Sequence, residues 1–140
     1  MRLLLAAATA LILIPVSASA AAWYLFYEDA DTSWYVDGDS ISKSGQWTNV
    51  ARYTRNHKVS PRTGVKAAKA SIAIDCRRRV YKMTRLETFD AAGKSLGAVN
   101  NPEGGQEHEN EPGSANEAMI KFACGNDRAG KASVADPSRD

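Results

Sequence analysis

Two cysteines constrain the fold of this chain more than any other feature. Cys76 ends the stretch Ser71–Cys76, in which Ile72, Ile74 and Cys76 alternate with small or polar residues, as on one face of a β-strand. Cys124 ends a short segment with helical spacing. A strand end and a helix end therefore each carry one cysteine, and we expect the rest of the chain to pack around this pair.

Residues 1–20 have the pattern of a signal peptide. Arg2 precedes the uncharged apolar run Leu3–Ile14, and small residues follow up to the sequence ASA at 18–20, which fits the A-x-A cleavage pattern. The apolar run is shorter than the roughly 20 residues that span a membrane. Cleavage is predicted after this triplet, with a second possible cut after Ala22. No cysteine lies near the cut, so no lipid or membrane anchor is expected after cleavage. The chain is predicted to be exported: periplasmic, extracellular or peripheral at the outer surface.

The predicted mature chain is long enough for one domain with one modest core. It keeps all but 20 of the 140 residues, and the net charge of +2 falls by one when Arg2 is removed. This balance argues against nucleic acid as a partner. Both cysteines lie in the mature part, so the oxidising compartment predicts a Cys76–Cys124 disulfide. No C-x-x-C motif is present, so we interpret the bond as a structural staple.

Apolar and alternating segments predict an α+β fold, with a single antiparallel sheet of about six strands and one C-terminal helix. Turns are expected at Asp37–Ser40, at Ser44-Gly45 and at Asp90–Lys94, where glycine and aspartate gather. The expected strands are Trp23–Tyr27, Ser33–Val36, a short one about Ile41, Trp47–Asn56, Val65–Cys76, the segment that follows the three arginines, and Ser95–Val99.

The apolar positions change parity after Arg77-Arg78-Arg79. They are even before this run and odd after it, at Tyr81, Met83 and Phe89. A turn or a bulge within the arginines accounts for the change.

The C-terminal third is predicted to hold the helix between two irregular segments. Asn100–Gly113 is polar and is expected to be mobile or loosely held. Ser114-Ala115-Asn116-Glu117 is a capping box that begins a helix reaching Cys124. Residues 126–140 are expected to be a disordered tail. Two alternatives remain for Cys124, which falls off the apolar stripe. Either the last helical turn loosens, or the buried face is Met119, Ile120, Ala123 and Cys124, and Phe122 points elsewhere.

Several of these segments together resemble the surface-adhesin protein E family. The matching pieces occur in the family's order and cover most of residues 22–124: Trp23, WYVDGDSISKSG at 34–45, SIAIDC at 71–76, TFDAAGKSL at 88–96 and PGSANEAMIKFAC at 112–124. The resemblance implies a domain over 21–125, with a helix tied to an antiparallel sheet by Cys76 and Cys124. It also implies a surface or periplasmic protein of Gram-negative bacteria. The founding adhesin of the family binds host extracellular-matrix and serum proteins.

Binding of a protein or glycan ligand is the predicted function, and five residues are its candidate contacts. Arg77, Arg78 and Arg79, with Lys82 and Arg85 nearby, form a basic patch that suits an acidic glycan or protein surface. The alternative for this patch is a solvated turn and a charge-protected edge strand. Trp34 and Tyr35 are candidate aromatic contacts from the aromatic-rich N-terminal half.

Catalysis, metal binding and cofactors are not predicted. His57 and His108 lie in polar loops without clustered ligands, and no nucleotide or triad motif occurs. Two alternative functions remain. A small secreted hydrolase would use His57 with Glu87 and Arg85 for acid–base chemistry. A periplasmic inhibitor or chaperone would have no adhesive role. A buried cleft containing His57 would favour the hydrolase.

Overall fold

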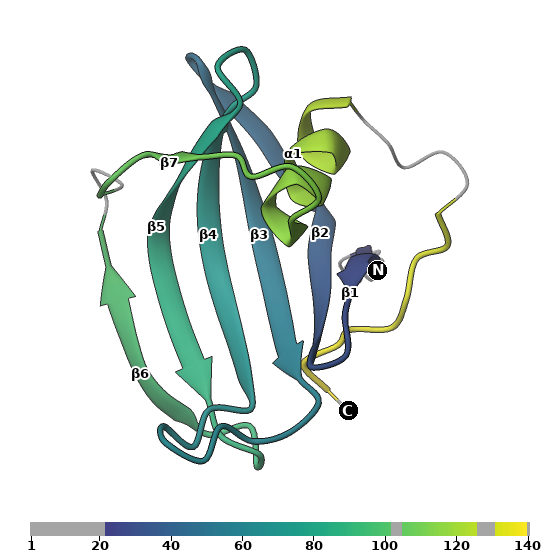
Figure 1. Cartoon of the computed structure of the whole chain (residues 1–140), viewed down its shortest axis with the longest axis vertical. Coiled ribbons are helices and arrows are strands. Elements are labelled where there is room, and N and C mark those ends of the chain that lie inside the picture. The colour runs from purple at the N-terminus through teal and green to yellow at the C-terminus, as the bar shows by residue number, and fades with distance from the viewer. Residues whose placement is uncertain (1–21, 102–104, 126–130, 140) are drawn as a thin grey trace, which may run out of the picture.

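The computed structural model describes residues 22–101, 105–125 and 131–139, and the predicted signal peptide lies outside them. The described chain forms one antiparallel sheet with a helix on one face (Figure 1). Strands β1 to β6 are neighbours in chain order, and β7 pairs with β5. The predicted fold is thus confirmed. The elements are β1 Trp23–Glu28, β2 Thr32–Ser44, β3 Trp47–Asn56, β4 Ala67–Asp75, β5 Val80–Phe89, β6 Ser95–Asn100, β7 His108–Glu109 and α1 Ala115–Gly125.

The disulfide joins the end of β4 to the end of α1. Cys76 and Cys124 are bonded, with their Cα atoms 5.6 Å apart. At the other end of α1, the Ser114 hydroxyl accepts a hydrogen bond from the Glu117 amide (3.2 Å), and the Glu117 carboxylate accepts one from the Gly113 amide (2.9 Å). The capping box therefore forms, with the return bond one residue earlier than in the standard pattern.

The helix packs over β1, β2 and β3, and its buried face is wider than either alternative predicted. Met119, Ile120, Phe122 and Ala123 are all buried, while Cys124 is exposed at the edge. Phe122 contacts the ring of Tyr24 from β1, with centroids 5.4 Å apart. The second alternative was therefore wrong about Phe122, because β1 closes around that side of the helix.

A chain of polar contacts positions α1 on the sheet. The Arg52 guanidinium of β3 donates to the Asn116 side-chain oxygen (3.2 Å), and the Asn116 amide donates to the Tyr81 hydroxyl of β5 (2.7 Å). Burial lowers the pKa of Arg52 to about 10. These two contacts join β3, α1 and β5, so the start of the helix is fixed independently of the disulfide at its end.

The predicted turn at Asp37–Ser40 was wrong. The chain continues there as part of β2, and its pairing with β3 shifts register between Asp37 and Ser42. Within this bulge, the Ser40 hydroxyl donates to the Asp37 carbonyl (2.7 Å) and accepts from the Ala51 amide (2.8 Å). Because a side chain satisfies the displaced backbone groups, the strand bends without ending.

The turn predicted in the arginine run accounts for the change of parity after β4, and a later register shift reverses it. A turn at residues 76–79 places Tyr81 and Met83 on the helix side. A second register shift in the β4–β5 pairing follows, because Ile72 pairs with Met83 and Ser71 pairs with Arg85. This shift returns Phe89 to the opposite face, where it belongs to a separate cluster. The prediction that Phe89 shares the face of Met83 was therefore wrong.

The second face of the sheet has its own small cluster. We call it the outer face, because it is turned away from α1. Trp23, Tyr53 and Ala67 are buried there, with Tyr35 and Phe89 packed against them.

Residues 131–139 lie against the sheet, in contrast to the predicted disordered tail. The Val134 amide donates to the Trp23 carbonyl (2.8 Å), and Pro137 is buried. The Pro137 carbonyl accepts a hydrogen bond from Arg55. This segment runs beside β1 in Figure 1.

The segment before the helix is also more ordered than predicted. Its residues His108 and Glu109 form β7 beside Val80 and Tyr81 of β5. The His108 ring stacks on the Tyr81 ring with centroids 5.4 Å apart. The composition of the residues around His108 gave no sign of this pairing, because the partner strand β5 lies much earlier in the sequence.

Candidate binding site at the arginine turn

The arginine turn, which we define as Arg77, Arg78 and Arg79, is organised by the preceding aspartate. Asp75 is 3% exposed. Its Oδ1 accepts hydrogen bonds from the amides of Arg77 and Arg78, both at 3.0 Å, and its Oδ2 accepts from Arg78 Nε at 2.8 Å. The bonds from the amide and the guanidinium of Arg78 hold the pKa of Asp75 below its usual value. Arg79 completes the turn at a φ of 57°. The buried Asp75 carboxylate therefore holds the backbone of Arg77 and Arg78, and the Asp75 carbonyl accepts a hydrogen bond from the Arg79 amide (2.8 Å).

Two of the three arginines are engaged in ion pairs. The Arg78 guanidinium makes two hydrogen bonds to the Glu107 carboxylate, at 2.7 and 3.0 Å. These bonds lower the pKa of Glu107. Arg79 lies 3.4 Å from the Glu117 carboxylate on α1. The turn thus joins β4 to the segment before β7 and to the helix, which is a structural role that the sequence did not reveal.

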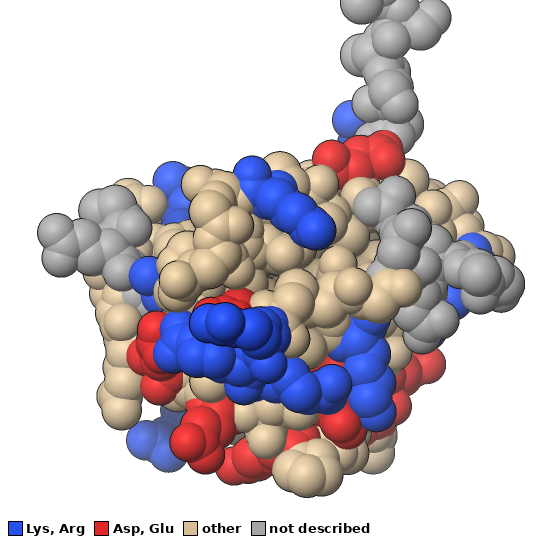
Figure 2. All heavy atoms as spheres, turned by 90° about the horizontal axis from the view of Figure 1, so that it is seen from above, with Lys and Arg blue, Asp and Glu red and all other residues tan. Residues whose placement is uncertain are grey.

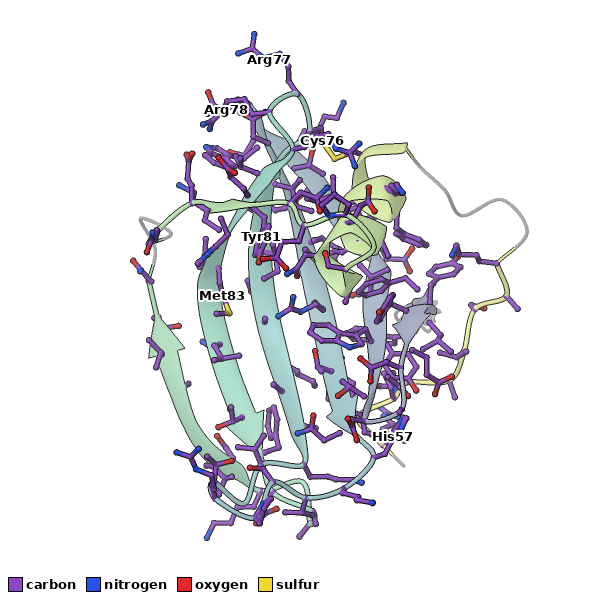
Figure 3. The ribbon with its side chains drawn as sticks, viewed as in Figure 1. His57, Cys76, Arg77, Arg78, Tyr81 and Met83 are labelled. Atoms are coloured by element: carbon purple, nitrogen blue, oxygen red, sulfur yellow. A yellow bond between two sulfur atoms is a disulfide. The ribbon has the colours of Figure 1, made fainter. Side chains whose placement is uncertain are left out.

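Arg77 extends positive charge beyond the turn, and Lys82 lies over an aromatic ring. Arg77 is exposed at the tip of the turn and points away from the sheet (Figure 3). Within the described ranges, its guanidinium has no hydrogen-bond or ion-pair partner. The Lys82 ammonium lies 4.3 Å from the centroid of the Trp47 ring, and the Arg78 guanidinium lies 5.8 Å from it. Figure 2 shows basic side chains gathered at this end of the molecule, with acidic ones beside them.

Trp34 and Tyr35 do not join this cluster. Adjacent residues of a strand face opposite sides, so Trp34 lies on the helix face and Tyr35 on the outer face. Trp34 stacks with the Arg52 guanidinium, 4.8 Å from the ring centroid, and Tyr35 packs against Tyr53. The two predicted aromatic contacts therefore belong to two different surfaces.

The aromatic residue that does accompany the arginines is Trp47, which sequence reasoning missed. Trp47 pairs with Asp75 across β3 and β4, so the β3 strand delivers it beside the turn. Its position after the Ser44-Gly45 turn was the available signal. Arg85, expected in the basic patch, lies farther along β5 and pairs with Glu87 (3.0 Å).

His57 lies at the opposite end of the sheet from the arginine turn (Figure 3). The buried Ser33 hydroxyl is 2.7 Å from Glu28 Oε1 and 2.9 Å from His57 Nε2. The other ring nitrogen, Nδ1, contacts the Ala30 carbonyl (3.0 Å). A serine triad needs the carboxylate on that second nitrogen, to orient the base. Here the carboxylate contacts the serine instead, so the cluster secures the loop after β1.

The residues named for the alternative hydrolase are not brought together as a catalytic group. His57 contacts Glu28 and Ser33, whereas Glu87 contacts Arg85. In the part of the chain that the structure describes, no group of three or more histidine, cysteine or acidic side chains has a geometry suited to a metal ion. No helix within residues 22–101, 105–125 and 131–139 is long and apolar enough to cross a membrane.

These features define a class of protein: a small domain with one antiparallel sheet, one helix joined to it by a disulfide, and a cluster of charged side chains at one end of the sheet. The chain belongs to the surface-adhesin protein E family, whose sequence model matches residues 23–125. The resemblance noted from the sequence is thereby confirmed. A comparison with curated protein sequences gave no match.

Two solved structures share the fold. One is crystal form II of Haemophilus influenzae protein E, with a TM-score of 0.52 and 14% sequence identity over 84% of this chain and 98% of that chain. The other is a second structure of Haemophilus influenzae protein E, with a TM-score of 0.52 and 13% identity over 81% and 92% of the two chains. At this identity, the comparison supports the fold alone.

Proposed function

We propose that this chain is an exported, non-enzymatic binding protein of the adhesin type, which holds an acidic protein or glycan at the arginine turn. The observation that carries the proposal is the placement of the exposed Arg77 and of the half-buried Lys82–Trp47 pair at one end of the sheet. Family membership supports a surface binding role, since the family is described as surface adhesins.

The charges at this end favour an anionic ligand. Arg78 and Arg79 are paired with Asp75, Glu107 and Glu117, whereas Arg77 has no ion-pair partner among the described residues, so positive charge remains at the tip of the turn. Complementary charge raises association rates and selects partners more than it raises affinity. The Trp47 ring adds a flat apolar surface beside the cations, which suits a sugar face or an aromatic side chain.

The test is a binding assay in which only the outward cations are removed. The variant Arg77→Ser with Lys82→Ser leaves Arg78 and Arg79 in their ion pairs, so the turn should keep its shape. The matched control, Lys58→Ser with Arg62→Ser, removes the same charge from an exposed loop away from the turn.

Binding to matrix proteins, serum proteins and acidic glycans would be measured by surface plasmon resonance at two salt concentrations. We expect the turn variant to bind about tenfold more weakly, equivalent to ~1.4 kcal/mol, and with less salt dependence. Equal binding by the turn variant and the control would contradict the role of the turn.

Export belongs to the same proposal. The predicted signal peptide lies outside the described residues, so its evidence is the pattern of Arg2, the apolar run and the small residues at the cut. Mass spectrometry of the exported protein should find Ala21 as the first residue, or Trp23 from the second site. Full-length chain recovered from the cytoplasm would refute export.

A further inference from the structure

The outer face carries a depression that arises directly from strand register. Arg55, Ala67 and Phe89 form one row across β3, β4 and β5, and Tyr53 and Lys69 are neighbours in the next row. The small side chain of Ala67 therefore lies among four large ones. It leaves a depression of about 290 Å³, bordered also by the β5–β6 turn.

A second depression continues the first along β4. Ala51 and Ser71 are cross-strand neighbours with short side chains, and Trp23 and Arg85 rise beside them. This second depression measures about 230 Å³, and Lys69 borders both. From Ala67 to Ser71 the strand advances four residues, or about 13 Å. We call the two depressions, which meet at Lys69, the outer-face groove. Its length exceeds that of one sugar ring.

The walls of the groove are aromatic and held in place. Tyr53 is 6% exposed and packs against the rings of Trp23 and Tyr35, both with centroids 6.2 Å away. Phe89 is half-buried at the far wall. Rings that packing has already fixed lose little conformational entropy when a ligand stacks on them.

Positive charge lies beside these rings. The exposed Lys69 ammonium is 5.9 Å from the centroid of the Phe89 ring. Lys66 also borders the first depression, and its ammonium donates a hydrogen bond to the carbonyl of His57 (2.9 Å). Because this carbonyl is neutral, it does not compensate the positive charge of Lys66. The nearby Asp90 carboxylate accepts hydrogen bonds from amides of its own turn and is directed toward the backbone.

The opposing carboxylates near Lys69 are already bonded to other groups. Glu87 accepts a hydrogen bond from Arg85 (3.0 Å). Asp136 accepts hydrogen bonds from the amide and the hydroxyl of Ser138. Both carboxylates lie within the electrostatic range of Lys69, and neither makes a hydrogen bond to it among the described residues. The groove therefore keeps a cation that can meet a ligand carboxylate.

The backbone beneath the groove excludes an added peptide strand. β4 is paired with β3 on one side and with β5 on the other, so its amides and carbonyls are occupied. A ligand here is recognised by side chains alone. Rigid rings with apolar faces and attached carboxylates meet this requirement better than an extended peptide, which gains affinity mainly from free strand edges.

We propose that the outer-face groove binds an acidic glycan. Lys69 faces the carboxylate of a uronic acid, the half-buried Phe89 ring contacts the face of a sugar ring, and the buried Tyr53 ring supports the groove from beneath. This site is separate from the arginine turn and does not depend on the function proposed there, because the two lie at different ends of the sheet.

The experiment titrates the mature chain with a hyaluronan hexasaccharide and follows backbone amide signals by NMR. The variants are Lys69→Gln and Phe89→Leu. The matched control is Lys121→Gln, which removes an exposed lysine from α1, on the opposite face of the sheet. A neutral chitin hexasaccharide tests the need for the carboxylate.

We expect shifts in residues 53, 67–69 and 89, about tenfold weaker binding in Lys69→Gln, weaker binding in Phe89→Leu, and unchanged binding in Lys121→Gln. Absence of shifts at millimolar hexasaccharide would overturn the proposal. So would shifts confined to residues 77–82, equal binding of the neutral sugar, or stronger binding of a hexaglutamate peptide. Groove signals that move on dilution alone would indicate a second copy of the chain as the occupant and would also overturn it.

Discussion

Removing the disulfide is the most direct test of how this fold is stabilised. The perturbation is Cys76→Ser with Cys124→Ser. The bond closes a loop with a sequence separation of 48. In the chain-entropy model, a loop of this length stabilises the folded state by ~4 kcal/mol, by restricting the unfolded chain.

The helix is also stabilised by packing and polar contacts, and these determine how the double variant should behave. Met119, Ile120 and Phe122 are each at most 1% exposed. Burial of side chains of this size contributes ~1.5–3 kcal/mol each. The Arg52–Asn116–Tyr81 contacts also hold the start of the helix. We therefore expect α1 to remain docked in the double variant at low temperature.

The assay is thermal unfolding followed by circular dichroism, with the reduced wild-type chain as a control of identical sequence. At roughly 4–8 °C per kcal/mol, the loss should lower Tm by more than about ten degrees. Hydrogen exchange should accelerate first at residues 114–125, while β4 stays protected longer. Equal Tm values for the oxidised protein and the double variant, or free thiols in the exported form, would refute the reasoning.

Two further predictions concern the helix and the arginine turn. Phe122→Ala should cost ~3–5 kcal/mol in chemical denaturation, because it empties a buried site, whereas the exposed control Lys121→Ala should stay within ~0.5 kcal/mol; similar costs would refute the packing. The pKa values of Asp75 and Glu107 are lowered by Arg78, so their stabilisation is present at neutral pH and is lost as the pH falls below about 4. Urea unfolding should therefore show less acid sensitivity in Arg78→Gln than in the wild type, and identical pH profiles would contradict this.

The parts of the fold that the sequence predicted are those set by local pattern. Alternation in β3 and the spacing of α1 follow from residues near one another in the chain, and so does the capping box at Ser114. The cysteine pair was predictable because only one pairing exists.

The parts that the sequence did not predict depend on contacts between distant residues. The bulge at Ser40 exists because its hydroxyl reaches Ala51 on the next strand, although Asp37 and Gly38 favour a turn by composition. Phe89 changed face because of a shift in pairing with β4, which no local pattern shows.

The candidate site follows the same division. The arginines are conspicuous in the sequence, but their neutralisation by Glu107 and Glu117 arises from folding. Trp47 belongs to the site through its pairing with Asp75, and the groove around Ala67 arises from side chains of three strands. Whether a small residue such as Ala67 leaves a depression depends on the sizes of its cross-strand neighbours, and these are known only once the strands are paired.

The hydrogen bond between Val134 and Trp23 joins the first strand to the last described segment. Because a chain is synthesised from its N-terminus, β1 is available well before Val134. Until then, the Trp23 carbonyl on the outer side of β1 has only water as its partner. Closing so long a loop is a late folding event. A chain without residues 131–139 would leave the Trp23 carbonyl at this strand edge without its protein partner, and an open strand edge can pair with another chain.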